Sequence, residues 1–145
     1  MHAKQLDDTS GIRTWALIFA AGDEPMSGMQ SFAELNHLGG SHFTAIGACR
    51  RVVLAWFDCD RREYRKIPIE QQVEVLSLIG DVSIGENGKP KVHAHVVVGK
   101  SDGTAHGGHL MQAEVRPTLE VILIESPRHL RRTFDPASGL ALIDV

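Results

Sequence analysis

Residues 91–111 read KVHAHVVVGKSDGTAHGGHLM and divide into two extended segments around a turn. The first segment, Lys91–Gly99, is rich in valine, which favours a β-strand. The second, Thr104–Met111, follows the sequence SDG at residues 101–103, where Ser, Asp and Gly favour a reversal of the backbone. We predict an antiparallel hairpin whose three-residue loop places Gly103 in the left-handed conformation of a bulge.

Three histidines converge in this predicted hairpin. His93 and His95 lie two residues apart, so their side chains point to the same face of the strand. With a three-residue loop, His95 faces His109 directly and His93 lies one diagonal step away. A two-residue loop would instead place His109 opposite Val96 and separate the histidines. The register of the hairpin therefore decides whether the three side chains can act together.

Three neutral imidazoles at this spacing suit zinc, with the fourth tetrahedral position left for water or a ligand. Imidazole also suits copper, nickel and iron, so zinc is the choice by availability and geometry. The structural alternative is that His93, His95 and His109 are half-buried polar residues, hydrogen-bonded to their neighbours. If a metal binds, its coordinated water could serve hydrolase or lyase chemistry. Candidate general bases for that chemistry are Glu74, Asp81 and Glu114.

The chain contains eight histidines, a high count for its length. His106 has the opposite parity to His109, so we expect it to point to the other face of the hairpin. The remaining four histidines have no partner at a useful spacing. We expect surface or capping roles for His2, His37, His42 and His129.

Outward from the hairpin, most of the chain is extended. Turn sequences at Asp58–Asp60 and Gly85–Pro90 separate several of these segments. Many short strands with one helix predict an α+β fold with a mostly antiparallel, twisted sheet. The segment Phe134–Val145 is predicted to be a turn with a final strand, or an arm that packs on a neighbouring subunit. The predicted strands are Ile12–Ala20, Phe43–Ala48, Arg51–Phe57, Arg62–Ile67, Val73–Ile84, Lys91–Gly99, Thr104–Met111 and Val115–Glu125.

The one main helix is expected after the first predicted strand. Asp23 is suited to cap it, and Pro25 to its first turn. Gly39 and Gly40 are expected to end it. The predicted apolar stripe consists of Met26, Met29, Phe32, Ala33 and Leu38.

The composition is that of a globular protein, with 145 residues, 15.9 kDa, 43% apolar and 23% charged residues. This size favours a single domain over residues 1–145. The longest apolar run, Trp15–Ala21, is far below the roughly 20 residues of a membrane-spanning helix. Asp7 and Asp8 interrupt the region where a secretory signal would be apolar, so we expect a cytoplasmic protein without membrane contact. The two cysteines, Cys49 and Cys59, are expected to be reduced core thiols.

A family resemblance rests on three blocks taken together: EVLSLIGDVSI at residues 74–84, the H-x-H of KVHAHVVV, and S-D-G-x-x-x-G-G-H-L at residues 101–110. Their order and spacing resemble the plants-and-prokaryotes-conserved (PPC) domain, and the upstream region that includes Gly47 is similar as well. The resemblance covers about residues 12–125, which leaves residues 126–145 as a C-terminal extension. It implies an α+β fold that assembles as a homotrimer, with strands packed across subunit boundaries.

The resemblance also bears on function. Plant relatives join the domain to AT-hooks, basic elements that enter the DNA minor groove, but an Arg-Gly-Arg-Pro core is absent here. Stand-alone prokaryotic members share the H-x-H and GGH histidines, which implies a metal site at His93, His95 and His109. We therefore expect a homotrimeric protein, with its activity unassigned, that binds a metal, zinc by preference, and a small ligand.

Nucleic-acid binding is the competing interpretation, in which the protein is a DNA-associated or regulatory interaction module. The formal net charge of −3 lacks the positive excess of most nucleic-acid binders. Local basic clusters could still attract phosphate. These clusters are Arg50-Arg51, Arg61-Arg62 with Arg65-Lys66, and Arg128 with Arg131-Arg132. Because the second alternates with Glu63 and lies near Asp58 and Asp60, it is more typical of a solvated hairpin.

Overall fold

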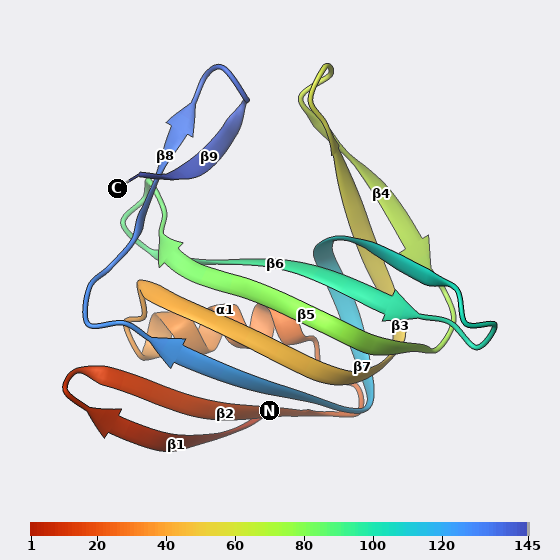
Figure 1. Cartoon of the computed structure of the whole chain (residues 1–145), viewed down its shortest axis with the longest axis horizontal. Helices are drawn as coiled ribbons and strands as arrows, with labels where there is room; N and C mark the ends of the chain where they lie inside the picture. Colours follow the sequence, from red (N-terminus) through yellow and green to blue (C-terminus); the bar gives the residue numbers. More distant parts are fainter. Residues whose placement is uncertain (145) are drawn as a thin grey trace.

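A computed structural model describes residues 1–144 of the chain (Figure 1). These residues form one helix, α1 (Pro25–Leu35), and a nine-stranded sheet. The pairing is antiparallel throughout, except for one parallel contact between Ile84 and Arg131. This confirms the predicted antiparallel sheet with one main helix. The strands are β1 (His2–Thr9), β2 (Ile12–Ala20), β3 (Gly40–Asp58), β4 (Glu63–Ile69), β5 (Val73–Ile84), β6 (Pro90–Gly99), β7 (Ala105–Glu125), β8 (Arg131–Asp135) and β9 (Leu140–Asp144).

The order of the strands places four of them in a closed ring. The sheet runs β1-β2-β7-β3-β5-β8-β9, β4 pairs with β3, and β6 pairs with both β5 and β7. Since β3 also pairs with β5 and β7, the strands β3, β5, β6 and β7 close on one another. Two hairpins, β3–β4 and β8–β9, project in the same direction from this body (Figure 1).

β3 and β7 are each one continuous strand where the sequence predicted two. Their registers shift at several points, so the strands bend without leaving the sheet. One bend is at Gly47, whose φ of 151° and close approach to the carbonyl oxygen of Thr118 leave no room for a Cβ. The bends explain why the sequence pattern is interrupted near residues 49–50 and 112–114.

The structure also corrects the prediction at both ends of the chain. β1 was not predicted, because all eight of its residues are exposed and no apolar alternation marks it. The strand is held by backbone pairing with β2. At the other end, the expected turn and final strand are present as residues 136–139 and β9, and β8, which was not expected, pairs with β9 to form a hairpin. Val145, the last residue of the predicted segment, lies outside the described residues.

The ends of α1 differ from the prediction. Glu24 caps the helix in place of Asp23, because its carboxylate accepts hydrogen bonds from the backbone N–H groups of Met26 and Ser27. The Asp23 carboxylate instead accepts from the N–H of Ala20 in the preceding turn. The helix ends before the two glycines, at Leu35.

The hydrophobic core lies between α1 and one face of the sheet. Phe19 and Leu17 of β2 are fully buried, as are Met29 and Ala33 of α1. Gly28 faces the ring of Phe19 so closely that a Cβ would overlap it, which allows the helix to approach the sheet. No helix among residues 1–144 has the length and apolar character that crossing a bilayer requires.

The two cysteines occupy different environments. Cys49 is buried in the core, and burial, followed by the charge of Glu24, raises the pKa of its thiol to about 11. Cys59 is exposed in the turn of the β3–β4 hairpin, so the prediction of two core thiols is wrong for this residue. The turn is polar on both sides, which leaves a side chain at this position in solvent.

Candidate metal centre

The β6–β7 hairpin has the predicted three-residue register. His95 pairs with His109, and Val96 pairs with Gly108. The loop is closed by hydrogen bonds from the N–H of Gly103 to the carbonyl of Lys100 and from the N–H of Lys100 to the carbonyl of Thr104, both 2.9 Å long. Gly103 has the expected positive φ of 80°. Of the two registers that the sequence allowed, the structure has the one on which the histidine cluster depends.

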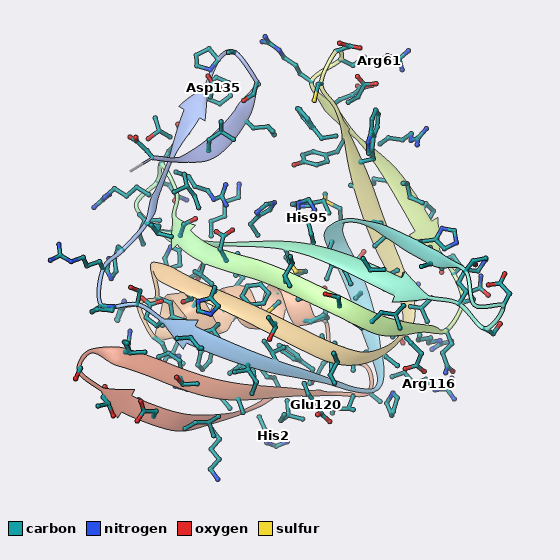
Figure 2. The ribbon with its side chains drawn as sticks, in the orientation of Figure 1. His2, Arg61, His95, Arg116, Glu120 and Asp135 are labelled. Atoms are coloured by element: carbon teal, nitrogen blue, oxygen red, sulfur yellow. The ribbon has the colours of Figure 1, made fainter. Side chains whose placement is uncertain are left out.

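His93, His95 and His109 come together as predicted. Each offers a ring nitrogen, and the three nitrogens lie within 4.8 Å of one another. The ring centroids are 5.0 Å apart for His93 and His95, 4.9 Å for His93 and His109, and 5.5 Å for His95 and His109. In Figure 2, His95 lies between the two projecting hairpins, which are marked by Arg61 and Asp135.

The surroundings favour the neutral form of two of these imidazoles, His95 and His109. Burial, reinforced by the charges of His93 and His95, lowers the pKa of His109 to about 4. Burial and the neighbouring His93 also lower the pKa of His95. Nδ1 of His109 is buried and has no hydrogen-bond partner among residues 1–144. A neutral ring with a buried, unpartnered nitrogen fits a metal ligand, because a transition metal binds the deprotonated nitrogen.

The other histidines do not join the cluster. His106 is exposed and pairs with Val98, on the opposite face from His109, as predicted. His2, His37, His42 and His129 are all exposed. His37 has a positive φ of 52° just beyond the end of α1, and so forms part of the turn that closes the helix.

A pocket of about 300 Å³ opens beside the cluster. Its walls include Ile79 and Asp81 of β5 together with His93 and His95. On the other side, the ring of Tyr64 in β4 lies 5.1 Å from the ring of His109. The two hairpins also meet beyond the site, where Nη2 of Arg62 donates to the carbonyl of Ala137 over 3.0 Å. The histidines are thus flanked by β5 and by both hairpins.

The glycine pair before His109 has a packing explanation. A Cβ on Gly108 would lie 2.7 Å from the carbonyl oxygen of Ala55 in β3. A Cβ on Gly107 would lie 3.2 Å from the carbonyl oxygen of Val96. Close approach of the β3 backbone is therefore the reason for Gly108.

Asp81 is the one predicted general base that lies at the cluster. Its Oδ2 is 3.4 Å from Nδ1 of His93, and both of its oxygens are 3.0 Å from Nη2 of Arg132. Burial raises the pKa of Asp81, but hydrogen bonds from His93 and Arg132 outweigh it, so the pKa is lowered overall. Asp81 is therefore ionised, and its carboxylate is already engaged by Arg132 and His93. A carboxylate in this state is a poor proton acceptor.

The other two predicted bases lie elsewhere. Glu74 is an exposed residue of β5 that pairs with Gly99. Glu114 is 3.0 Å from Nε of Arg51 and 3.3 Å from Nη1 of Arg50. The basic pair at residues 50–51 is thus partly neutralised by Glu114.

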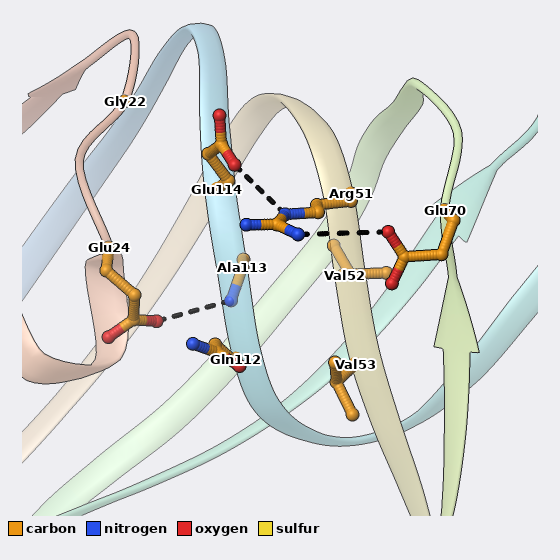
Figure 3. Close-up of a pocket in the computed structure, with 9 residues that line it drawn as sticks. All are labelled: Gly22, Glu24, Arg51, Val52, Val53, Glu70, Gln112, Ala113 and Glu114. Carbon is orange, nitrogen blue, oxygen red and sulfur yellow. Dashed lines mark hydrogen bonds and ion pairs between the residues drawn. The ribbon is translucent and has the colours of Figure 1, made fainter.

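A second hollow of about 280 Å³ shares no residue with the histidine site (Figure 3). Arg51 lies between Glu114 and Glu70 there, and the Glu24 carboxylate accepts from the N–H of Ala113 (Figure 3). Arg51 is paired with two carboxylates, and Glu24 accepts hydrogen bonds from backbone N–H groups. These groups already have partners, so the hollow holds no set of converging ligand atoms from residues 1–144 comparable to the three imidazoles.

Sequence reasoning missed two neighbours of the cluster. The sequence places Arg132 in a basic cluster with Arg128 and Arg131, and it places Tyr64 within residues 61–66, a stretch typical of a solvated hairpin. Both residues reach the site through pairing between strands that are distant in the sequence: β8 with β5 for Arg132, and β3, the hairpin partner of β4, with β7 for Tyr64. The spacing of nearby residues does not predict such pairing. Asp81 was named as a base, but its place opposite His93 depends on the β5–β6 register.

The comparisons with known proteins identify the family. The model of the Plants and Prokaryotes Conserved (PCC) domain, also written PPC, matches residues 6–127. The chain belongs to this PPC domain family. The match begins within β1 and ends just before the β8–β9 hairpin, so it includes all three histidines. It confirms the family resemblance seen in the sequence.

Solved PPC-like structures share this fold. A metal-containing protein of Archaeoglobus fulgidus is 35% identical, covers 91% of this chain and 93% of its own, and has a TM-score of 0.83. A PPC protein of Pyrococcus horikoshii is 29% identical over 99% of this chain and 95% of its own, with a TM-score of 0.84.

A more distant structure supports the fold alone. A protein of Bacteroides thetaiotaomicron with a provisional DNA-binding name is 22% identical over 98% of this chain and 96% of its own, with a TM-score of 0.86. The search of curated proteins gives no significant match.

Proposed function

We propose that this PPC-domain protein binds one transition-metal ion, zinc by preference, through His93, His95 and His109. The observation that carries the proposal is the convergence of three ring nitrogens within 4.8 Å. Zinc sites with three protein ligands leave a fourth position open to water or substrate. The pocket lined by Ile79 and Asp81 lies beside the histidines, and a small ligand would bind there.

Two further observations support the metal. The lowered pKa values of His95 and His109 mean that little energy is needed to deprotonate these rings for coordination at neutral pH. The Archaeoglobus fulgidus relative, at 35% identity, is a metal-containing protein. The structural alternative, in which the imidazoles bond to one another, leaves Nδ1 of His109 buried without a partner.

A metal-assisted hydrolase or lyase is the enzymatic form of this proposal. A bound zinc ion would supply Lewis acidity and lower the pKa of a coordinated water. Since Asp81 is engaged by Arg132, this carboxylate is better suited to orient His93 than to accept a proton from water. Activity that is lost on chelation and restored by added metal would identify such an enzyme.

We also propose the homotrimer that the PPC resemblance implies. The sheet face opposite α1 carries His93 and His95 beside exposed isoleucines. The exposed fractions are 62% for Ile46, 56% for Ile79 and 43% for Ile122. An exposed apolar surface of this kind is typical of a protein interface.

Zinc titration with a competing chromophoric chelator tests the metal site. We expect one zinc ion per chain for the parent and a large loss of affinity for His109→Ala, because this change removes one of the three proposed ligands. His106→Ala is the matched control, because it removes a histidine from the same strand but from the opposite face. Equal zinc affinity in the parent and in His109→Ala would contradict the proposal.

A further inference from the structure

A residue from the C-terminal hairpin reaches the histidine site. Arg132 lies in β8, beyond the end of the PPC match at residue 127. Its side chain is only 11% exposed and extends back to β5. The root of the hairpin is fixed by backbone hydrogen bonds of 2.8 Å from Ile84 to Leu130 and 2.7 Å from Leu130 to Gly39. The guanidinium of Arg132 therefore reaches the site from a strand, β8, whose start is fixed by backbone hydrogen bonds to the rest of the sheet.

Each of the three guanidinium nitrogens of Arg132 donates at least one hydrogen bond. Nη2 lies 3.0 Å from each oxygen of Asp81, Nε donates to Oγ of Ser83 over 2.9 Å, and Nη1 donates to the carbonyl of Ala141 over 2.9 Å. Oγ of Ser83, which is fully buried, lies 3.3 Å from Oδ1 of Asp81 and can donate to it. Asp81 is thus held from two sides.

This arrangement selects a tautomer for His93. Nδ1 of His93 lies 3.4 Å from Oδ2 of Asp81 and 3.3 Å from Nη2 of Arg132. Nη2 makes its shorter contacts with the carboxylate, so Nδ1 can carry a proton and donate it to Oδ2. Nε2 is then unprotonated and available to the cluster. A histidine that donates its second nitrogen to a carboxylate is the usual arrangement around a metal.

We infer that Arg132 is a positioning residue, which acts through Asp81 to hold His93 as the Nδ1–H tautomer with Nε2 free. The C-terminal hairpin thereby becomes part of the candidate metal centre. Its consequence for metal binding rests on the proposed function. Loss of such a carboxylate–histidine partner weakens metal binding by roughly 10- to 100-fold.

Zinc affinity measured with the chelator tests this consequence. We expect Arg132→Gln to bind zinc about 10-fold more weakly than the parent and Asp81→Ala to show a similar loss. Arg131→Gln is the matched control, because Arg131 is the exposed neighbour on the same strand. Arg132→Lys should recover only part of the affinity, since an ammonium group lacks the planar fork of guanidinium. Thermal melting of each variant separates a local loss from unfolding.

The tautomer itself is measured without metal. Side-chain ¹H–¹⁵N spectra of the metal-free parent should show His93 protonated at Nδ1, and Arg132→Gln and Asp81→Ala should show a mixture of tautomers. If the parent binds no zinc but the tautomer responds in this way, the proposed function fails and the role of Arg132 stands. If the parent binds zinc and both the tautomer and the affinity are unchanged in Arg132→Gln, the role of Arg132 is overturned.

Discussion

At His109, burial and two neighbouring imidazoles act in the same direction on one ring. They lower the pKa of the folded state to about 4, whereas the ordinary value is 6.5. Between these two values the unfolded chain binds a proton that the folded protein does not. The free energy of unfolding therefore decreases as the pH falls from 6.5 toward about 4, and the contribution of His109 is complete above 6.5.

We predict that metal-free protein is less stable to urea at about pH 5 than at about pH 7, and that His109→Gln reduces this difference. Urea denaturation of both proteins at the two pH values measures the effect. His106→Gln serves as the control, since His106 is exposed and should keep the pH dependence of the parent. If His109→Gln and the parent lose the same free energy on acidification, the lowered pKa of the half-buried His109 ring is contradicted.

At the scale of the element, the β6–β7 hairpin depends on one glycine. Gly103 has a φ of 80°, and no atom lies within 4 Å of the position of an added Cβ. A substitution there adds backbone strain without a steric clash. We predict that Gly103→Ala lowers the free energy of unfolding by about 1 kcal/mol while zinc affinity is retained, because the register of the hairpin is unchanged.

Chemical denaturation and the chelator titration together test this prediction. Ser101→Ala, in the same loop and exposed, is the control for side-chain effects. A Gly103→Ala protein with parental stability would show that the loop does not need the left-handed conformation. A large loss of zinc affinity in a folded Gly103→Ala protein would contradict the prediction that this substitution leaves the hairpin register unchanged.

The elements also show what short-range pattern can and cannot predict. The hairpin and its cluster follow from residue parity and a three-residue turn, so His93, His95 and His109 were predictable together. β1 was not, because an edge strand with every side chain exposed has no apolar alternation. Arg132 and Tyr64 were not, because their positions depend on how distant hairpins pack against the ring of strands. The long strand β3, which bends at Gly47 and near Arg51, was predicted as two strands for a different reason. A bulge interrupts the apolar pattern without ending the strand.

At the scale of the whole molecule, we expect the exposed isoleucines of the open sheet face to lie in the interface of the proposed homotrimer. We expect light scattering to give a mass about three times the 15.9 kDa of one chain. Ile46→Asp, on the open sheet face, should shift the mass toward the single chain, because a buried carboxylate without a partner is costly. Leu35→Asp is the matched control, because Leu35 is 79% exposed at the end of α1, away from that face. A mass near that of one chain for the parent would contradict the trimer.

Metal content is the most direct measure of the candidate centre. Elemental analysis of tag-free protein, with His95→Ala prepared in the same way, counts the metal ions per chain. We predict about one equivalent in the parent and none in His95→Ala, with both proteins folded. No metal in the parent after zinc supplementation, or equal metal in the parent and in His95→Ala, would contradict a metal centre formed by His93, His95 and His109.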